Sequence, residues 1–371
     1  MTTRILVAGA IAARPHRGGH AAALLQWAMG FRDLGYDTWF VDRLPPGTTT
    51  DPAWLGHVMD TPGLRRRYVL LDGDECIGRT RRDLMAFAHD AVLFDINGFL
   101  ADDDVLGSVS RRVYVDVDPG FPQLWHALGT HDAFSRHDAF VTVGANVGSP
   151  ASIIPGCGRT WIATPPPVYL PWWPSTPRPA TDLVTSVAMW RGPFAPVDYR
   201  GERYGLRVHE FRRFVDVAAR VDARCELALD IDPVADATDV ERLHAHGWHL
   251  VDPQVVAPDP FAYRAYLRRS VAELCVAKEL YVKANTGWVS DRSACYLASG
   301  RPVVAQDTGW RTQYGGTEGL VAFADADEAV DALREVLADY ERHAKAAVTL
   351  AHDCFASTVV LPALLDRLGL R

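Results

Sequence analysis

The densest group of residues able to bind a ligand lies in segment 285–310, which reads NTGWVSDRSACYLASGRPVVAQDTGW. The pattern predicts a polar loop, a helix beginning near Ser290 and Asp291, and a buried strand that ends at Gln306 and Asp307. The first N–H groups of a helix lack partners within the helix, so together with a serine hydroxyl they can bind a phosphate. Two polar loops at the same end of an α/β unit therefore predict a ligand site.

Arginines near this segment could add positive charge to a phosphate site. Arg191 follows a predicted strand at 181–189, Arg207 precedes a predicted helix, and Arg292 lies in the first turn of the helix after Ser290. A guanidinium group binds phosphate through two parallel hydrogen bonds, which makes arginine well suited to this role.

A second candidate for chemistry is His20, at the end of the glycine-rich segment 13–20, which reads ARPHRGGH. Histidine suits general-base catalysis because its pKa lies near neutral pH. A carboxylate would have to orient the ring, and the candidates at or near the ends of predicted strands are Asp95, Asp116 and Asp118. We do not expect Asp116 and Asp118 to bind a metal, because no cluster of histidines or carboxylates accompanies them.

The elements that would position these residues alternate between strand and helix. A strand at 4–10, a helix at 21–34 and a strand at 38–41 form a βαβ unit, which predicts a parallel sheet. Seven prolines crowd segment 164–179, which predicts a stiff connector. A second alternation follows. We therefore predict an α/β protein with two Rossmann-like domains facing a central cleft, one at 1–178 and one at 179–350, followed by a C-terminal helix at 351–371.

Composition excludes several other classes of protein. The net charge of −8 gives no reason to expect nucleic acid or an anionic membrane as a partner. No apolar run approaches the roughly 18–20 residues of a membrane span, and the N-terminus lacks a signal-peptide pattern. The six cysteines show no metal or redox spacing. We expect a cytoplasmic protein.

The loop NTGWVS, followed by Gly-Arg-Pro and Gln-Asp, resembles the nucleotide-sugar signature of GT-B glycosyltransferases, in the branch of plant and bacterial natural-product enzymes. The resemblance implies that Asn285 replaces the family's phosphate-contacting histidine, and that Gly287 and Ser290 occupy its glycine and phosphate-binding serine. Gln306 and Asp307 fall where the family binds the hydroxyls of the donor sugar.

One departure concerns the family's ribose-binding glutamate, which falls at Ser293. Asp291 is the nearest carboxylate and could replace it, with Arg292 as a further phosphate ligand.

The glycine-rich segment is similar to the Gly-His opening of the same family, which implies that His20 deprotonates the acceptor and that Asp95 orients His20. The resemblance further implies that the domain at 1–178 binds the acceptor, that the domain at 179–350 binds the nucleotide sugar, and that the C-terminal helix at 351–371 packs back on the first domain. We expect Gly19, Asp118 and Phe121 to contact the acceptor. Arg191 and Arg207 match instead the Arg/Lys pair of GT-B enzymes that retain the sugar's configuration, although a base such as His20 indicates inversion. We favour inversion.

The implied activity is transfer of a sugar from a UDP-, dTDP- or GDP-sugar to a hydroxyl or amine of a small molecule, such as a natural product, with no cofactor and no metal. The sequence leaves a homodimer open. Alternatives are a retaining transferase, a sugar-nucleotide epimerase, and a non-catalytic nucleotide-sugar-binding protein. The architecture by itself also fits periplasmic-type binding proteins.

Overall fold

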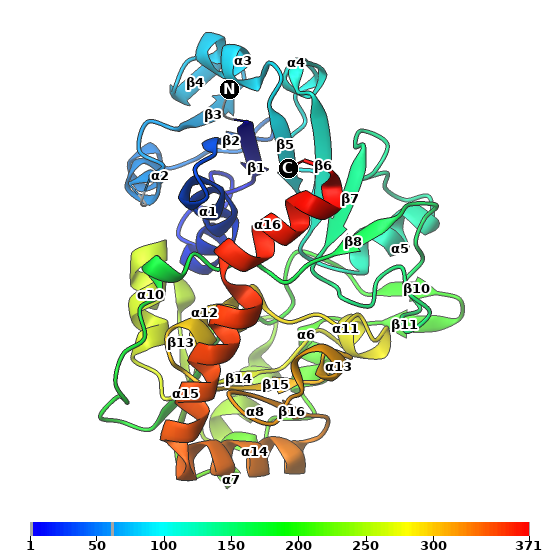
Figure 1. Cartoon of the computed structure of the whole chain (residues 1–371). Helices are drawn as coiled ribbons and strands as arrows, with labels where there is room; N and C mark the ends of the chain where they lie inside the picture. Colours follow the sequence, from blue (N-terminus) through cyan, green and yellow to red (C-terminus); the bar gives the residue numbers. More distant parts are fainter. Residues whose placement is uncertain (1–2, 61–62, 371) are drawn as a thin grey trace.

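The computed structural model describes residues 3–60 and 63–370, which form two α/β halves, one above the other (Figure 1). The described part of the N-terminal half contains an eight-stranded sheet in the order β4-β3-β2-β1-β5-β6-β7-β8, with β4 antiparallel to β3 and the other neighbours parallel. Its strands are β1 (Arg4–Gly9), β2 (Asp37–Arg43), β3 (Tyr68–Asp72), β4 (Glu75–Gly78), β5 (Val92–Ile96), β6 (Arg111–Asp116), β7 (Ala139–Thr142) and β8 (Trp161–Ala163). Its helices are α1 (Gly18–Asp33), α2 (Pro52–Met59), α3 (Arg81–Ala88), α4 (Asp103–Ser108) and α5 (Phe121–Ala127).

The C-terminal half is built on a six-stranded parallel sheet in the order β13-β12-β9-β14-β15-β16. Its strands are β9 (Leu183–Met189), β12 (Arg224–Asp230), β13 (Trp248–Val251), β14 (Ala272–Cys275), β15 (Val303–Gln306) and β16 (Leu320–Phe323), and a separate hairpin joins β10 (Val197–Tyr199) and β11 (Glu202–Tyr204). Its helices are α6 (Arg207–Phe211), α7 (Val217–Arg220), α8 (Ala237–Ala245), α9 (Pro253–Val256), α10 (Pro260–Arg268), α11 (Glu279–Lys283), α12 (Asp291–Ala298), α13 (Arg311–Tyr314), α14 (Ala326–Ala338) and α15 (Tyr340–Leu350).

The burial of the middle strands fits the largely parallel pairing of the two sheets. The middle strand β1 is apolar and buried from Ile5 to Ala8, and β14 and β15 are buried throughout. Strands covered by helices on both faces must be apolar on both faces, as parallel sheets require. The predicted α/β fold with two Rossmann-like halves is confirmed.

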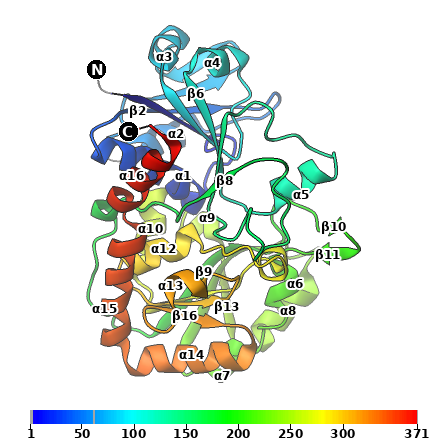
Figure 2. The same ribbon diagram turned by 45° about the vertical axis from the view of Figure 1, so that its right-hand side comes forward.

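The chain crosses between the halves twice, and the two crossings touch. The proline-rich connector contains a short 3-10 helix, η1 (Leu170–Trp172), and the return crossing consists of the π-helical turn η2 (Ala351–Phe355) and α16 (Ser357–Leu368). The Val168 N–H donates to the Phe355 carbonyl (2.7 Å), and the Ser357 N–H donates to the Val168 carbonyl (2.8 Å). Figures 1 and 2 show α15 and α16 as one column along the side of both halves, with α16 against α1.

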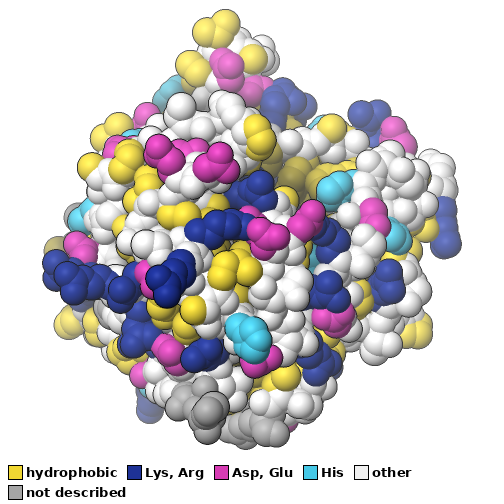
Figure 3. Space-filling model, turned by 90° about the horizontal axis from the view of Figure 1, so that it is seen from above, with side chains coloured by type: hydrophobic (Ala, Val, Ile, Leu, Met, Phe, Trp, Pro, Cys, Tyr) yellow, Lys and Arg dark blue, Asp and Glu magenta, His cyan; other side chains and the backbone are white. Residues whose placement is uncertain are grey.

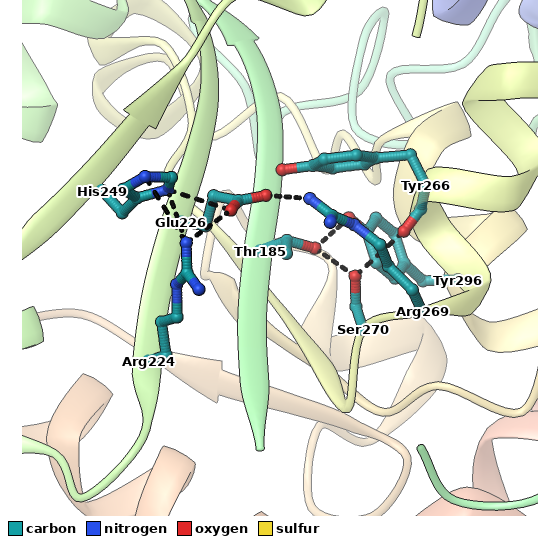
Figure 4. A network of polar contacts seen from close by, with 8 residues as sticks. All are labelled: Thr185, Arg224, Glu226, His249, Tyr266, Arg269, Ser270 and Tyr296. Atoms are coloured by element: carbon teal, nitrogen blue, oxygen red, sulfur yellow. Dashed lines mark hydrogen bonds and ion pairs between the residues drawn. The ribbon is translucent and has the colours of Figure 1, made fainter. Parts of the chain in front are cut away.

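A buried polar network joins the C-terminal sheet to its helices (Figure 4). The Glu226 carboxylate on β12 is 3% exposed, forms ion pairs with Arg224 and Arg269, and lies 3.0 Å from Nδ1 of His249. On neighbouring β9, the Thr185 hydroxyl lies 2.6 Å from the hydroxyls of both Ser270 and Tyr296. These contacts satisfy polar groups that would otherwise be buried without partners.

The surface at the N-terminal end of the molecule carries mixed charge. Figure 3 looks onto this end and shows Lys/Arg, Asp/Glu and hydrophobic side chains interspersed. Within residues 3–60 and 63–370, no helix has both the length and the apolar character needed to cross a membrane.

Candidate functional site

One cleft lies where loops from the two halves meet. Segments after the carboxyl ends of β1, β5 and β6 form one wall, and segments after β9, β12 and β14, together with the start of α12, form the other. The cleft encloses about 1450 Å³, including space open to solvent. The carboxyl ends of parallel strands are where open α/β sheets bind ligands, so this cleft is the candidate site.

Eight of the fourteen predicted site residues line this cleft. Three belong to the N-terminal half: Gly19, His20 and Asp118. Five belong to the C-terminal half: Arg191, Arg207, Ser290, Asp291 and Arg292. Residues more than 270 positions apart in sequence thus share one cavity.

His20 is oriented by the backbone. Its Nε2 lies 2.8 Å from the Ala10 carbonyl, which can only accept, so Nε2 carries the proton and Nδ1 is left as the acceptor. The pKa of His20 is lowered to about 4, mainly by burial. The positive charge of Arg14 also lowers this pKa, and its effect is larger than the opposing effect of the Ala10 hydrogen bond. The imidazole is therefore neutral at pH 7.

The predicted pairing of Asp95 with His20 is wrong. Asp95 lies inside β5 rather than after it, is fully buried, and contacts His137 Nε2 at 3.1 Å and the Leu100 N–H at 3.2 Å. Burial raises the pKa of the Asp95 carboxyl despite the contact with His137. The carbonyl of Ala10 makes the contact that we expected from a carboxylate.

Arg207 is a buried cation that has no carboxylate counterion within residues 3–60 and 63–370. Its side chain is 8% exposed, lines the cleft, and donates to the Val276 carbonyl. Among the described residues, no carboxylate forms an ion pair with it. Burial lowers the pKa of Arg207, and the positive charge of Arg292 lowers it further. A buried charge in such surroundings is costly unless an anion compensates it, so this position favours an anionic ligand.

The start of α12 has the predicted polar arrangement. Ser290 is the N-cap, and its hydroxyl accepts a hydrogen bond from the Arg292 N–H at 3.2 Å. Burial raises the pKa of the Asp291 carboxyl, which Arg292 partly opposes. The Arg292 side chain forms a buried ion pair with Glu273 and donates to the Val187 carbonyl (2.7 Å). Arg292 thus fixes α12 to β14 and β9 while lining the cleft.

Arg191 is half-exposed and already paired. Its guanidinium binds Asp236 Oδ1 through Nε (2.8 Å) and a terminal nitrogen (2.5 Å). Arg191 therefore lines the cleft with its positive charge largely compensated by Asp236.

The remaining predicted residues lie outside the cleft wall. Asn285 and Gly287 contact the opposite half instead: the Asn285 amide donates to the Ala151 carbonyl (2.8 Å), and the Gly287 backbone lies against Ala145 and Asn146. A Cβ on Gly287 would approach the Asn146 nitrogen to 3.0 Å, so this glycine is needed for the close contact between the halves.

Gln306 and Asp307 also make structural contacts. The Gln306 amide is 2% exposed and bridges the Ala277 N–H (3.1 Å) and Glu210 (2.7 Å). Asp307 accepts a hydrogen bond from the Gly309 N–H at 2.8 Å. Phe121 is fully buried and contacts the ammonium group of Lys278, which itself lines the cleft.

Sequence reasoning missed Lys278. Its ammonium group forms an ion pair with Asp118, lies 3.0 Å from the Tyr281 hydroxyl, and sits 5.0 Å from the ring centroids of Phe121 and Phe194. Burial by itself would raise the pKa of Asp118, but Lys278 and the Tyr281 hydroxyl outweigh it and lower that pKa. Lysine occurs three times in the whole chain, and its position directly after a buried strand was the available signal.

Two arginines of the loop after β1 were also missed as individual site residues. Arg14 and Arg17 both line the cleft, and Arg17 forms an ion pair with Asp230 at 2.7 Å across the two halves. Within the described residues, no group of three or more His, Cys, Asp or Glu side chains is arranged to hold a metal ion.

Comparison with solved structures places this architecture among known folds. No family model and no curated protein matches the sequence. HepE from Anabaena, solved with UDP and glucose, is similar at 12% identity, with 99% of each chain covered and a TM-score of 0.58. An α-glucosyltransferase solved with UDP and mismatched DNA is similar at 11% identity over 99% of this chain and 100% of that one, with a TM-score of 0.62. Sucrose-phosphate synthase from Thermosynechococcus elongatus is similar at 10% identity over 99% of each chain, with a TM-score of 0.55. At such identities the likeness establishes the fold, which is GT-B.

Proposed function

We propose that the protein is a glycosyltransferase that moves a sugar from a nucleoside diphosphate sugar to an acceptor nucleophile. The observation that carries this proposal is the buried Arg207 in the cleft between two Rossmann-like halves, positively charged and without a carboxylate partner among the described residues. A diphosphate supplies the missing negative charge, and its departure from the sugar is favoured by fixed cations.

The donor binds to the C-terminal half, which we place at residues 179–350. Arg207 and Arg292 face the diphosphate, the Ser290 hydroxyl and the first N–H groups of α12 add hydrogen bonds, and Arg191 lies at the rim. UDP is the first nucleotide to test, because several structures with this fold were solved with UDP or UDP-glucose.

The acceptor binds to the N-terminal half, residues 1–178, and His20 is its general base. The acceptor oxygen attacks the anomeric carbon, the bond from that carbon to the diphosphate oxygen breaks, and Nδ1 of His20 takes the acceptor proton. Nδ1 is the nitrogen left free by the Ala10 hydrogen bond. Direct displacement of this kind inverts the anomeric configuration.

The donor site is tested by replacing Arg207. We expect wild-type protein to bind UDP and UDP-glucose in calorimetry, and Arg207→Gln to weaken UDP binding about tenfold or more, the equivalent of one lost charged contact. Arg203→Gln is the matched control, because Arg203 is exposed on β11 outside the cleft. Equal UDP affinity in Arg207→Gln and wild type would contradict the donor assignment. If dTDP or GDP binds and UDP does not, the nucleotide of the donor is different but the assignment of the donor site stands.

The acceptor is tested separately. We propose a small molecule with a hydroxyl or amine, and DNA is the competing acceptor because three similar structures, all of an α-glucosyltransferase, contain DNA. The net charge of −8 opposes DNA binding. Transfer of radiolabelled sugar from UDP-glucose to an acceptor panel that includes duplex DNA decides between them. Anomeric NMR of a product distinguishes inversion from retention, and nucleotide-sugar binding without turnover on any acceptor would indicate a binding protein.

A further inference from the structure

The cleft contains more positive charge than a diphosphate site accounts for. Six cationic side chains line it, and four of them are paired with carboxylates within the protein: Arg17 with Asp230, Arg191 with Asp236, Arg292 with Glu273 and Lys278 with Asp118. Among the described residues, the other two have no ion pair with a carboxylate. One is Arg207, which we assign to the donor, and the other is Arg14.

Arg14 belongs to the opposite half from Arg207. It follows β1 in the N-terminal half, and its guanidinium lies 5.7 Å from the centroid of the Phe99 ring. Burial lowers the pKa of Arg14, Asp118 opposes this effect, and the charge of Arg17 adds to it. Asp118 is itself committed to Lys278 and Tyr281. Arg14 is thus a partly buried cation backed by an aromatic ring, with no carboxylate of its own.

The neighbours of Arg14 are acceptor-side groups rather than donor-side groups. The charge of Arg14 acts on His20, the proposed base, and Phe99 and Asp118 belong to the same N-terminal wall. The charge that acts on Arg207 is that of Arg292, in the C-terminal half. An anion at Arg14 would therefore lie beside the base, where the acceptor must place its nucleophile.

We propose that the acceptor carries an anionic group, a carboxylate or a phosphate, which binds Arg14 beside Phe99. This proposal rests on the proposed transferase function for the identity of the ligand as the acceptor. The guanidinium forms two parallel hydrogen bonds with either anion. The Phe99 ring provides an apolar surface for the part of the acceptor that joins the anionic group to its hydroxyl or amine.

The experiment uses the full chain and three simple probes. Phenyl phosphate and benzoate are titrated by calorimetry, with phenol as the uncharged probe, in the presence and absence of saturating UDP. UDP occupies the Arg207 site, so the probes then report the remaining anion site. We expect at least one anion to bind the UDP complex and phenol to bind at least about tenfold more weakly.

The variants identify the residue. Arg14→Gln is expected to weaken anion binding about tenfold or more and to leave the UDP affinity unchanged. Arg14→Lys keeps the charge but loses the paired hydrogen bonds, so intermediate affinity is expected. Arg159→Gln is the matched control, because Arg159 also lies over an aromatic ring, that of Phe140, but is exposed and outside the cleft.

Two results would overturn the proposal. One is that neither anion binds the wild-type UDP complex, or that the anion affinity is unchanged in Arg14→Gln. The other is a loss of UDP affinity in Arg14→Gln as large as that in Arg207→Gln, which would make Arg14 a donor ligand. Failure of the proposed function looks different: no nucleoside diphosphate binds the wild type, while phenyl phosphate or benzoate alone still binds in an Arg14-dependent manner.

Discussion

At the scale of single residues, the orientation of His20 is the feature with the clearest chemical consequence. A carboxylate next to an imidazole stabilises the imidazolium form and raises its pKa, whereas a carbonyl fixes the tautomer with less stabilisation of the charge. His20 has the carbonyl of Ala10, while the carboxylate of Asp95 is used by His137. The His20 imidazole is thus neutral, and its low pKa makes it a weaker base than an imidazole paired with a carboxylate.

Removal of the base should affect turnover and leave binding intact. His20→Ala is expected to lower kcat by roughly 10²–10⁴-fold, the usual contribution of a general base, with the UDP affinity unchanged. Sugar-transfer assays measure kcat, and calorimetry measures the UDP affinity. His131→Ala is the control, because His131 is exposed. If sugar transfer is undiminished in His20→Ala, His20 is not the general base, and a retaining mechanism is favoured.

The low pKa of His20 also predicts a pH effect on stability. Between pH 6.5 and about 4 the unfolded chain binds a proton at this histidine and the folded protein does not. Stability must therefore fall as pH falls through this window, by up to about 3 kcal/mol for a shift of this size. Asp42 and Asp116, whose pKa values burial raises to about 6, contribute with the opposite sign.

The contribution of His20 is isolated by comparison with His20→Gln, whose amide can still donate to Ala10 but does not titrate. Urea unfolding at pH 7, 5.5 and 4.5 should show wild-type stability falling relative to the variant as the pH decreases. Parallel pH dependence in the two proteins would show that His20 titrates alike in the folded and unfolded states.

At the scale of elements, strand-end loops explain which residues were predictable. Parallel strands with apolar runs, such as β1 and β15, are recognisable in the sequence. His20 lies in the first turn of α1, which follows β1, and Ser290 is the N-cap of α12, which precedes β15. The short hairpin β10–β11 and the antiparallel β4 carry no such pattern and were missed. The helix predicted to follow Arg207 is instead divided between α6, which begins at Arg207, and α7.

Side-chain partners were less predictable than positions. Gln306 and Asp307 follow the correct strand, but the Gln306 side chain turns to Glu210 on α6, a residue 96 positions away. Asn285 and Gly287 lie in the correct loop, yet that loop packs on residues 145 and 146 of the other half. Such contacts depend on how the halves meet, which a local sequence pattern does not contain.

The buried ion pair between α12 and β14 should be a major support of the donor wall. In Glu273→Gln the Arg292 guanidinium would remain buried without its counterion, since Glu273 is fully buried and Arg292 is 8% exposed. Removing one partner of a buried pair costs about 3–5 kcal/mol. Chemical denaturation measures this loss, and Glu241→Gln, at an exposed position on α8, is the control. A change below about 1 kcal/mol would mean that Arg292 finds another partner.

At the scale of the whole molecule, the cleft depends on the contacts that hold the halves together. The connector and the return crossing are hydrogen-bonded at Val168, and Arg17 pairs with Asp230 beside the cleft. On the same side, the Gly18 N–H donates to the Ala257 carbonyl at 3.0 Å, which joins the start of α1 to the segment between α9 and α10. The loop that carries Arg14 and His20 is thus fixed directly to the C-terminal half.

Gly18 is the position at which a single methyl group should disturb this arrangement. A Cβ there would lie 2.1 Å from the Asp259 carbonyl oxygen and 2.6 Å from that of Ala257, both backbone atoms, so Gly18→Ala must push α1 away from the C-terminal half. We expect sugar transfer to fall by at least tenfold, since a displacement of about 1 Å at a catalytic group can cost on the order of 10²-fold. UDP affinity should change less, because the donor wall belongs to the other half.

Gly56→Ala on α2 is the control, since its Cβ would meet no atom within 4 Å and alanine favours a helix. Transfer in Gly18→Ala equal to that in Gly56→Ala would mean that catalysis tolerates separation of the halves at this contact, and the positions of Arg14 and His20 would then have to be fixed by the N-terminal half by itself.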